Sequence, residues 1–366
     1  MKTILTVFGT RPEAIKICPL IKELKMRRNF KTVVCVTGQH RQMLDAALDE
    51  FGVTADYDLS VMREGQTPLD VTSEILRKIG IVLDKVKPDV VLVHGDTTTA
   101  FATALACFYK RISIGHVEAG LRTYNIHSPH PEEFNRQVIS KIAKYNFAPT
   151  DTARKNLIRE GIRAESIFVT GNTVIDALKS TVRAEYSHPL FEWARGSRLI
   201  VVTAHRRESI GAPMHNMLRG IRRVIEEIPD VKAIYPIHKN PRVKAIAKKE
   251  LFGCERIRLI EPLGVTDFHN ILARSYMILT DSGGIQEEAT ALGKPTLVMR
   301  DTTERPEGIE AGTLRLVGTE ESAVYKSFKF FLESKDAYRK MTKASLSYGD
   351  GSASRRIADI LERENI

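Results

Sequence analysis

Short apolar runs rich in β-branched residues alternate with longer amphipathic stretches along the whole chain. Apolar residues at helical spacing predict helices, and the short continuous apolar runs between them predict strands. A strand that is apolar on both faces is typical of a parallel sheet covered by helices on both sides. The alternation therefore predicts an α/β protein built on doubly wound parallel sheets.

The alternation falls into two halves of similar architecture, which for a chain of 366 residues indicates two domains. In the first half the predicted strands are residues 4–8, 33–36, 90–94, 112–116, 145–147 and 167–169. In the second half they are residues 199–203, 233–235, 257–260, 277–280, 296–298 and 314–317. We predict a first Rossmann-like domain of residues 1–172 and a second of residues 173–351. A break at residues 348–351 would let a last helix, about 352–366, cross back onto the first domain.

The composition excludes several classes of protein. Hydrophobic residues make up 43% and charged residues 27%, which does not fit a disordered chain. The four cysteines are scattered without a C-x-x-C pair, which supports neither a disulfide scaffold nor a zinc knuckle. The first apolar run is too short for a signal peptide, and no apolar run approaches the roughly 18 residues of a membrane span. We therefore expect a soluble cytoplasmic protein.

The net charge of +10 requires an anionic partner to be considered. The basic residues occur as separate pairs with acids nearby, and no aromatic residues are interleaved with them as in RNA-binding sheets. The pattern favours a small phosphorylated ligand over nucleic acid.

Acidic residues follow two predicted strands of the first half. Asp96 follows residues 90–94, Glu118 follows residues 112–116, and Glu132 opens a predicted helix soon afterwards. Singly, each has a structural explanation: a helix cap, a partner for Arg122, or a first-turn acid. Together they favour acid–base chemistry, because neighbouring carboxylates raise one another's pKa and supply both a base and an acid.

Two histidines precede these acids by two residues, so each shares a strand face with its acid. His94 and His116 with Asp96 and Glu118 would make a metal site of two histidines and two carboxylates. A histidine within a buried strand is more often a satisfied core residue. We expect no metal.

The second half offers a proton donor and an anion site. His205 follows residues 199–203 and suits proton donation or a phosphate contact. After residues 277–280 comes Asp281-Ser282-Gly283-Gly284, which opens a predicted helix. Backbone N–H groups and the helix dipole at such a turn favour a phosphate, with a simple serine cap as the alternative. An acid one turn further on suits ribose hydroxyls.

Cations and glycines near the N-terminus complete the pattern. Arg11 lies in the first strand-to-helix turn, and Lys16 about one turn into the helix. This turn lacks the G-K-[ST] ending of a Walker loop, and no G-x-G-x-x-G motif follows a predicted strand. We therefore expect no tightly bound NAD. Since no metal is expected either, we predict an enzyme that needs no cofactor.

With these residues in view, the chain resembles the non-hydrolysing UDP-N-acetylglucosamine 2-epimerases almost end to end. The similar runs are residues 8–16, 94–99, 115–123, 131–136, 203–208, 280–288 and 300–308. The resemblance implies two domains facing a cleft as in GT-B glycosyltransferases, a homodimer, and reversible conversion of UDP-N-acetylglucosamine to UDP-N-acetylmannosamine for bacterial surface polysaccharide. UDP would leave to give 2-acetamidoglucal and then add back.

The resemblance also assigns residues by matching motif. The catalytic residues would be Asp96, Glu118, Glu132 and His205. The residues that hold UDP would be Arg11, Lys16, Phe268, Ser282, Gly283, Gly284, Glu288 and Arg305. A second, activating substrate molecule would meet Gln39, Gln42, Glu132, Arg206 and His238, although Gly65 stands where some regulated members carry arginine.

Other activities stay open at this stage. A glycosyltransferase of similar fold, an epimerase for a modified UDP-sugar, or a hydrolysing epimerase would use a comparable nucleotide site. A nucleotide-sensing or nucleic-acid-binding protein would need no carboxylates there.

Overall fold

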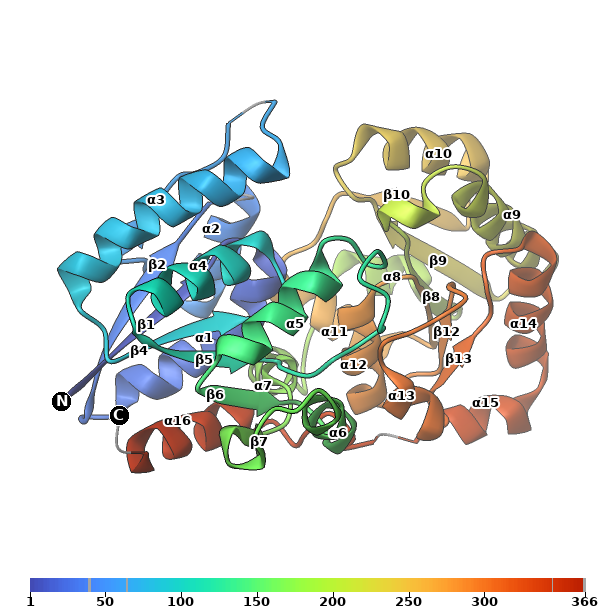
Figure 1. Ribbon diagram of the computed structural model, residues 1–366. Helices are drawn as coiled ribbons and strands as arrows, with labels where there is room; N and C mark the ends of the chain where they lie inside the picture. The colour runs from blue at the N-terminus through green and yellow to red at the C-terminus, as the bar shows by residue number, and fades with distance from the viewer. Residues whose placement is uncertain (39–40, 64, 344, 365–366) are drawn as a thin grey trace. The chain divides into compact units, whose positions relative to one another are not determined.

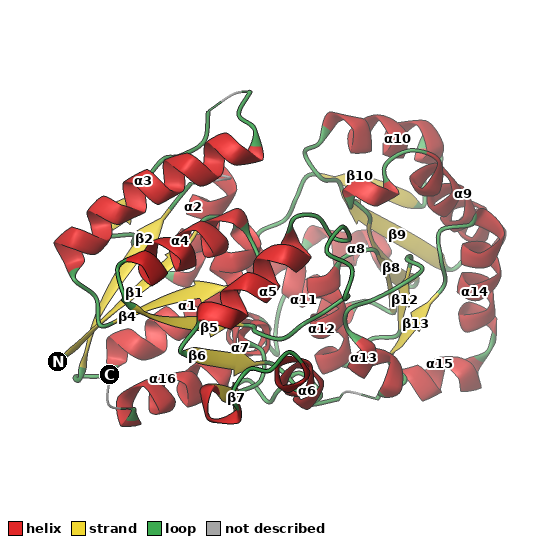
Figure 2. Cartoon of the chain, viewed as in Figure 1, coloured by secondary structure: helices red, strands yellow, loops and turns green. Residues whose placement is uncertain are grey.

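The computed structural model describes residues 1–38, 41–63, 65–343 and 345–364. The chain divides into two compact units, which we call unit 1 (Met1–Lys179 with Tyr348–Ile366) and unit 2 (Ser180–Ser347). Each is a parallel sheet flanked by helices; Figure 2 shows the strands in yellow and the helices in red. The predicted α/β class with two doubly wound sheets is confirmed.

Unit 1 contains, over its described residues, a seven-stranded parallel sheet with the order β3-β2-β1-β4-β5-β6-β7. Its strands are β1 (Lys2–Phe8), β2 (Phe30–Val36), β3 (Tyr57–Asp58), β4 (Val90–His94), β5 (Ser113–Val117), β6 (Tyr145–Ala148) and β7 (Ile167–Val169). Its α-helices are α1 (Arg11–Met26), α2 (Arg41–Phe51), α3 (Pro68–Val86), α4 (Thr98–Tyr109), α5 (Glu132–Ile142), α6 (Asp151–Arg159), α7 (Thr173–Thr181) and α16 (Ala353–Arg363). The predicted strands are confirmed, and only β3 was missed, because Tyr57-Asp58 carries no apolar run.

Both faces of this sheet are buried, as the continuous apolar strands predict. Leu5 and Val7 of β1 pack in one cluster with Ile79 of α3 and Ala104 of α4. On the other side, α1 contacts β1, β2, α2 and α16. Figure 1 shows α16, in red, lying beside α1, in blue. The last helix thus belongs to unit 1.

The division between the units falls between Lys179 and Ser180, near the end of α7. The second domain was expected to begin at residue 173, the first residue of this helix. Most of α7 stays with unit 1 because Asp176 accepts hydrogen bonds from the main chain of Ala353 and Ser354 at the start of α16, at 3.1 and 2.8 Å.

Unit 2 contains, over its described residues, a six-stranded parallel sheet with the order β10-β9-β8-β11-β12-β13. Its strands are β8 (Arg198–Thr203), β9 (Val231–Pro236), β10 (Ile257–Ile260), β11 (Met277–Thr280), β12 (Thr296–Val298) and β13 (Leu314–Leu316). Its α-helices are α8 (Pro189–Ala194), α9 (Ala212–Glu227), α10 (Pro241–Leu251), α11 (Val265–Arg274), α12 (Gly283–Leu292), α13 (Pro306–Glu310), α14 (Glu321–Glu333) and α15 (Lys335–Met341).

Alternate residues of β8 serve the two faces of this second sheet. Ile200 and Val202 pack in a cluster with residues of α9 and α14, whereas Leu199 and Val201 pack with residues of α11 and α12. Helices thus cover both faces of the sheet, which leaves its strand ends to carry the polar chemistry.

Strand order reverses at one point in each sheet, between β1 and β4 in unit 1 and between β8 and β11 in unit 2. Ligands of doubly wound sheets bind outside the carboxyl ends of the strands at such a switch point. These two places are where the candidate site residues have to be sought.

Candidate active site

Two of the three predicted acids of unit 1, Asp96 and Glu118, lie close together beside its switch point. β4 ends at His94, two residues before Asp96, and β5 ends at Val117, immediately before Glu118. The two strands are neighbours in register, with His94 opposite Val117, so both turns leave the same edge of the sheet. Glu118 is 6% exposed, which places its carboxylate inside the fold.

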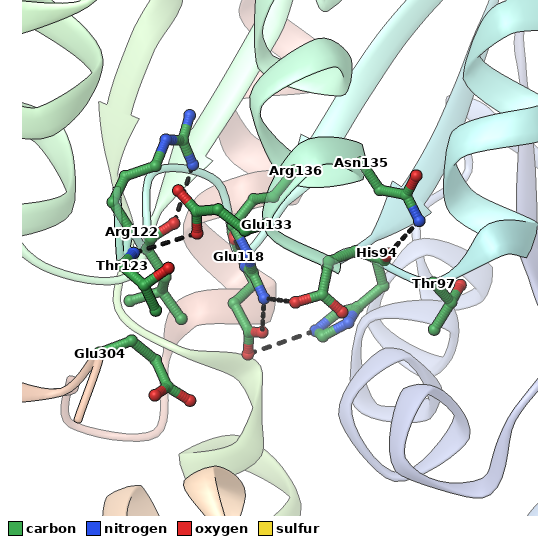
Figure 3. Close-up of polar contacts among 12 residues, drawn as sticks. His94, Thr97, Glu118, Arg122, Thr123, Glu133, Asn135, Arg136 and Glu304 are labelled. Carbon is green, nitrogen blue, oxygen red and sulfur yellow. Dashed lines mark hydrogen bonds and ion pairs between the residues drawn. The ribbon is translucent and has the colours of Figure 1, made fainter. Parts of the chain in front are cut away.

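Arg136 of α5 joins the two acids. Its Nη2 donates to the carboxylate of Asp96 and lies 3.5 Å from Oε1 of Glu118, and its Nη1 donates to the Glu118 carbonyl at 2.7 Å. Asn135 holds the same turn, because its amide donates to the Asp96 carbonyl at 2.9 Å. Figure 3 shows Arg136 beside the carboxyl group of Glu118. One rigid fork therefore sets the separation of both carboxylates.

Glu118 has further partners on its other oxygen. The ammonium of Lys16 donates to Oε2, and the amide of Asn172 donates to the same oxygen at 2.9 Å. Its backbone φ of 66° lies in the left-handed region, which is strained for a glutamate. Strain of this kind clusters at functional sites, where the surrounding contacts enforce it.

The two strand histidines remain neutral inside unit 1. Burial, more than any neighbouring charge, lowers the pKa of His94 and of His116 to about 3. Nε2 of His94 lies 3.8 Å from Oε2 of Glu118, not against Asp96 as the strand spacing suggested. His116 is occupied on both nitrogens, by the Gly95 carbonyl at 2.7 Å and the Ser140 hydroxyl at 3.2 Å.

No group of three or more histidines, cysteines, aspartates or glutamates in the described ranges is arranged to hold a metal ion. In the same ranges, no helix is both long and apolar enough to cross a membrane.

Two adjacent glutamates open α5 and differ in their contacts. Glu133 is 3% exposed and accepts hydrogen bonds from the main chain of Thr123 and Tyr124 at 3.0 and 3.2 Å, so it holds the loop after Glu118 (Figure 3). The predicted catalytic Glu132 is half-buried and begins the helix. The sequence also suggested Arg122 as a structural partner of Glu118, but Arg122 pairs with Glu160 at 2.7 Å.

The turn after β1 is braced by a carboxylate that the sequence reasoning did not single out. Thr10 caps α1, and Glu13 accepts hydrogen bonds from the main chain of Gly9 and Thr10 at 3.1 and 2.8 Å. The hydroxyl of Thr97 donates to the other oxygen of Glu13 at 2.8 Å. The half-buried Arg11 is the first residue of the helix. The capping-box spacing of Thr10 and Glu13 is the sequence pattern from which the contact of Glu13 with this turn could have been predicted.

The predicted anion turn of unit 2 takes the expected form. Ser282 is the N-cap of α12, its side chain makes no capping bond, and Gly283 and Gly284 are the first helical residues. A Cβ on Gly284 would meet nothing within 4 Å, whereas one on Gly283 would lie 2.3 Å from Nη1 of Arg305. The N-terminus of α12 therefore has open space at Gly284, where backbone N–H groups suit a phosphate.

Arg305 lies in an ion-pair cluster beside this turn. Its Nε donates to Glu287 at 2.7 Å and its Nη1 to Glu304. Arg206 and Arg300 also approach Glu304, at 3.3 and 3.0 Å. The three guanidinium groups hold the pKa of Glu304 far below its usual range despite burial, which on its own would raise it. The predicted UDP ligand Arg305 is thus paired with two glutamates beside the turn.

Glu288, the predicted ribose partner, has an unused acceptor. The residue is 7% exposed, its Oε2 is buried without a hydrogen-bond partner, and its Oε1 lies 3.7 Å from Nε2 of His269. A hydroxyl donor would satisfy that oxygen. Phe268 is partly buried against the cluster that includes Ile285.

His205 follows β8 at the switch point of unit 2. Its ring stacks on His238, with centroids 5.4 Å apart and planes at 9°. Arg206 pairs with Glu208 at 3.0 Å as well as with Glu304. Of the expected activating site, Gln39 and the side chain of Gln42 lie outside the described residues.

Comparisons with known proteins decide the family. Residues 22–362 match the family described as UDP-N-acetylglucosamine 2-epimerase. The chain belongs to the UDP-N-acetylglucosamine 2-epimerase family. The resemblance seen in the motifs is thereby confirmed.

Individual members of the epimerase family are similar over nearly their whole length. A Bacillus subtilis UDP-N-acetylglucosamine 2-epimerase is 56% identical, covering 98% of this chain and 94% of that protein. A Staphylococcus aureus protein solved with UDP is 50% identical with a TM-score of 0.96, covering 99% and 96% of the two chains. A Neisseria meningitidis epimerase bound to UDP-N-acetylglucosamine is 44% identical with a TM-score of 0.95, covering 99% and 100%.

Proposed function

We propose that the protein interconverts UDP-N-acetylglucosamine and UDP-N-acetylmannosamine by eliminating UDP and adding it back. The observation that carries the proposal is the Arg136 fork, which holds the carboxylates of Asp96 and Glu118 together at the switch point of unit 1. Family membership supports the substrate, since solved relatives contain UDP or UDP-N-acetylglucosamine.

The chemistry explains why carboxylates are needed. The hydrogen on C2 of the sugar has no adjacent carbonyl to acidify it, so direct deprotonation is prohibitive. When the C1–O bond breaks, its electron pair leaves with UDP, and positive charge at C1 acidifies the C2 proton. A carboxylate takes that proton, and the C2–H electron pair forms the C1=C2 bond of 2-acetamidoglucal.

The return steps reverse this sequence on the other face of the sugar. A carboxylic acid protonates C2 from the opposite side, and an oxygen of UDP attacks C1 again. Asp96, Glu118 and Glu132 share these roles in our proposal. Each positioned proton-transfer group contributes about 10²–10⁴-fold to the rate.

Unit 2 supplies the nucleotide contacts in this proposal. The open N-terminus of α12 at Gly284 and the guanidinium cluster around Arg305 favour the diphosphate, and the unused Oε2 of Glu288 suits a ribose hydroxyl. Charge that develops on the leaving diphosphate would be stabilised there. Neither NAD nor a metal ion enters the proposed steps.

The test is proton NMR of purified protein with UDP-N-acetylglucosamine, EDTA and no added cofactor. A new anomeric doublet of the manno epimer supports the proposal. Free N-acetylmannosamine would show a hydrolysing enzyme instead, and an unchanged spectrum would overturn the assignment. Homodimeric assembly, a cytoplasmic location and activation by a second substrate molecule stay predictions.

A further inference from the structure

Asp281 and His205 lie side by side at the switch point of unit 2. His205 follows β8 and Asp281 follows β11, and these neighbouring parallel strands are in register with Thr203 opposite Thr280. One oxygen of Asp281, Oδ2, accepts hydrogen bonds from the main-chain N–H groups of His205 and Arg206, both at 2.9 Å. The carboxylate therefore fixes the backbone that carries the imidazole.

The second oxygen of Asp281 is the unusual feature. Asp281 is 0% exposed, and its Oδ1 is buried without a hydrogen-bond partner. Nδ1 of His205 lies 3.6 Å from this oxygen. A buried acceptor without a donor costs free energy, and an N–H on Nδ1 of His205 would supply that donor.

The surroundings leave this pairing undisturbed. Tyr235 of β9 faces the same carboxylate, and burial followed by the charge of Asp281 raises the pKa of its phenol above its usual range. Its hydroxyl donates to the Ala204 carbonyl, so it does not compete for Oδ1. Arg206 directs its guanidinium to Glu208 and Glu304. His238 stacks on the imidazole face and restricts its rotation.

We propose that Asp281 is a positioning residue that keeps a proton on Nδ1 of His205, so that Nε2 is the atom that gains and loses the catalytic proton. The inference rests on the proposed function and adds to it a role for His205, as the proton donor to the leaving diphosphate. When Nε2 carries its proton, the ring is an imidazolium stabilised by the buried carboxylate. In this proposal the imidazolium donates Nε2–H to the oxygen that leaves C1.

The decisive variant is Asp281→Asn. Its amide oxygen can still accept from the two main-chain N–H groups, but its NH₂ group then faces Nδ1 and favours the tautomer with the proton on Nε2. We expect kcat to fall about 10²–10⁴-fold, as for an aspartate-to-asparagine change beside a catalytic histidine, with the Kd for UDP changed less than about 3-fold. Asp281→Glu, which keeps the carboxylate, should restore part of the rate.

Imidazole ¹⁵N NMR of histidine-labelled protein provides a readout independent of activity. The His205 signals, assigned by their loss in His205→Gln, should show Nδ1 protonated in the wild type and Nε2 protonated in Asp281→Asn. An unchanged tautomer would overturn the inference. A wild type that shows this tautomer but no epimerisation would instead overturn the proposed function.

A double-mutant cycle separates positioning from a structural effect. If Asp281 acts through His205, Asp281→Asn should cost less than about 3-fold when His205 is already Gln. Equal losses in both backgrounds would show that Asp281 acts by another route.

Discussion

The hydroxyl of Thr97 donates a hydrogen bond of 2.8 Å to the carboxylate of Glu13. This bond joins the turn after β1 to the turn after β4, on the two sides of the switch point of unit 1. Glu13 is 3% exposed, and burial raises its pKa to about 7, against the opposing effect of its hydrogen bonds. Glu13, which links these two turns, therefore titrates near neutral pH.

Glu13 makes stability depend on pH in a defined window. Between its ordinary pKa of 4.5 and about 7, the folded chain holds a proton that the unfolded chain has lost. Its contribution is full below pH 4.5 and is lost as pH rises through about 7, by about 3 kcal/mol. The Glu13→Gln side chain cannot titrate. In denaturant unfolding, the free energy of unfolding of this variant relative to the wild type should therefore rise by about that amount between pH 4.5 and 8.

The titration of His94 and His116 contributes equally to the stability of both proteins, so it cancels in this comparison. A difference in unfolding free energy that stays constant from pH 4.5 to 8 would show that Glu13 does not titrate in the folded chain.

Glu118→Gln should lower kcat about 10²–10⁴-fold, because the amide cannot accept the C2 proton. Asn172 and Lys16 can still donate to the amide oxygen, so the fold should persist. Epimerisation measured by NMR checks the rate, and circular dichroism checks the fold. Glu165→Gln, at a 70% exposed side chain of the same unit, is the matched control and should keep the wild-type rate. Full activity in Glu118→Gln would remove Glu118 from the mechanism.

Arg136→Lys keeps the charge and loses the fork. A lysine ammonium cannot reach Asp96 and both groups of Glu118 in the observed geometry, so the carboxylates should move apart. We expect kcat to fall about 10²-fold with little change in UDP affinity. The exposed Arg163→Lys serves as control. An unaltered kcat would mean that the fork has no part in positioning the acids.

Gly284→Ala tests the anion turn without disturbing the protein. An added methyl at Gly284 meets no protein atom, so stability should hold, but the methyl should occupy the space of the diphosphate. Isothermal titration should show the Kd for UDP rising about 10-fold or more. In Gly80→Ala, within α3, the methyl has comparable room and UDP binding should stay unchanged. Equal affinities in all three proteins would place the diphosphate elsewhere.

The sequence predicted the strands and the acids at their ends for one physical reason. Parallel strands buried on both faces must be continuous apolar runs, and the carboxyl ends of neighbouring strands share an edge. Asp96 and Glu118 therefore meet as expected. The two-residue strand β3 escaped prediction because its pairing, not its composition, makes it a strand.

The partners of these acids were beyond the sequence reasoning. Strand order and helix rotation bring Arg136 between Asp96 and Glu118, and bring Lys16 to Glu118 across 102 residues of chain. Asp281 was visible as an acid after a strand, but only the order β8-β11 places it against His205. Side-chain pairing across a sheet depends on topology that local patterns do not encode.

The most direct test of the account is the reaction in D₂O, with the product examined at C2 by NMR. If carboxylates remove a proton from C2 and return one, UDP-N-acetylmannosamine should carry deuterium at C2 from the first turnovers. Product that forms with protium retained at C2 would contradict the account.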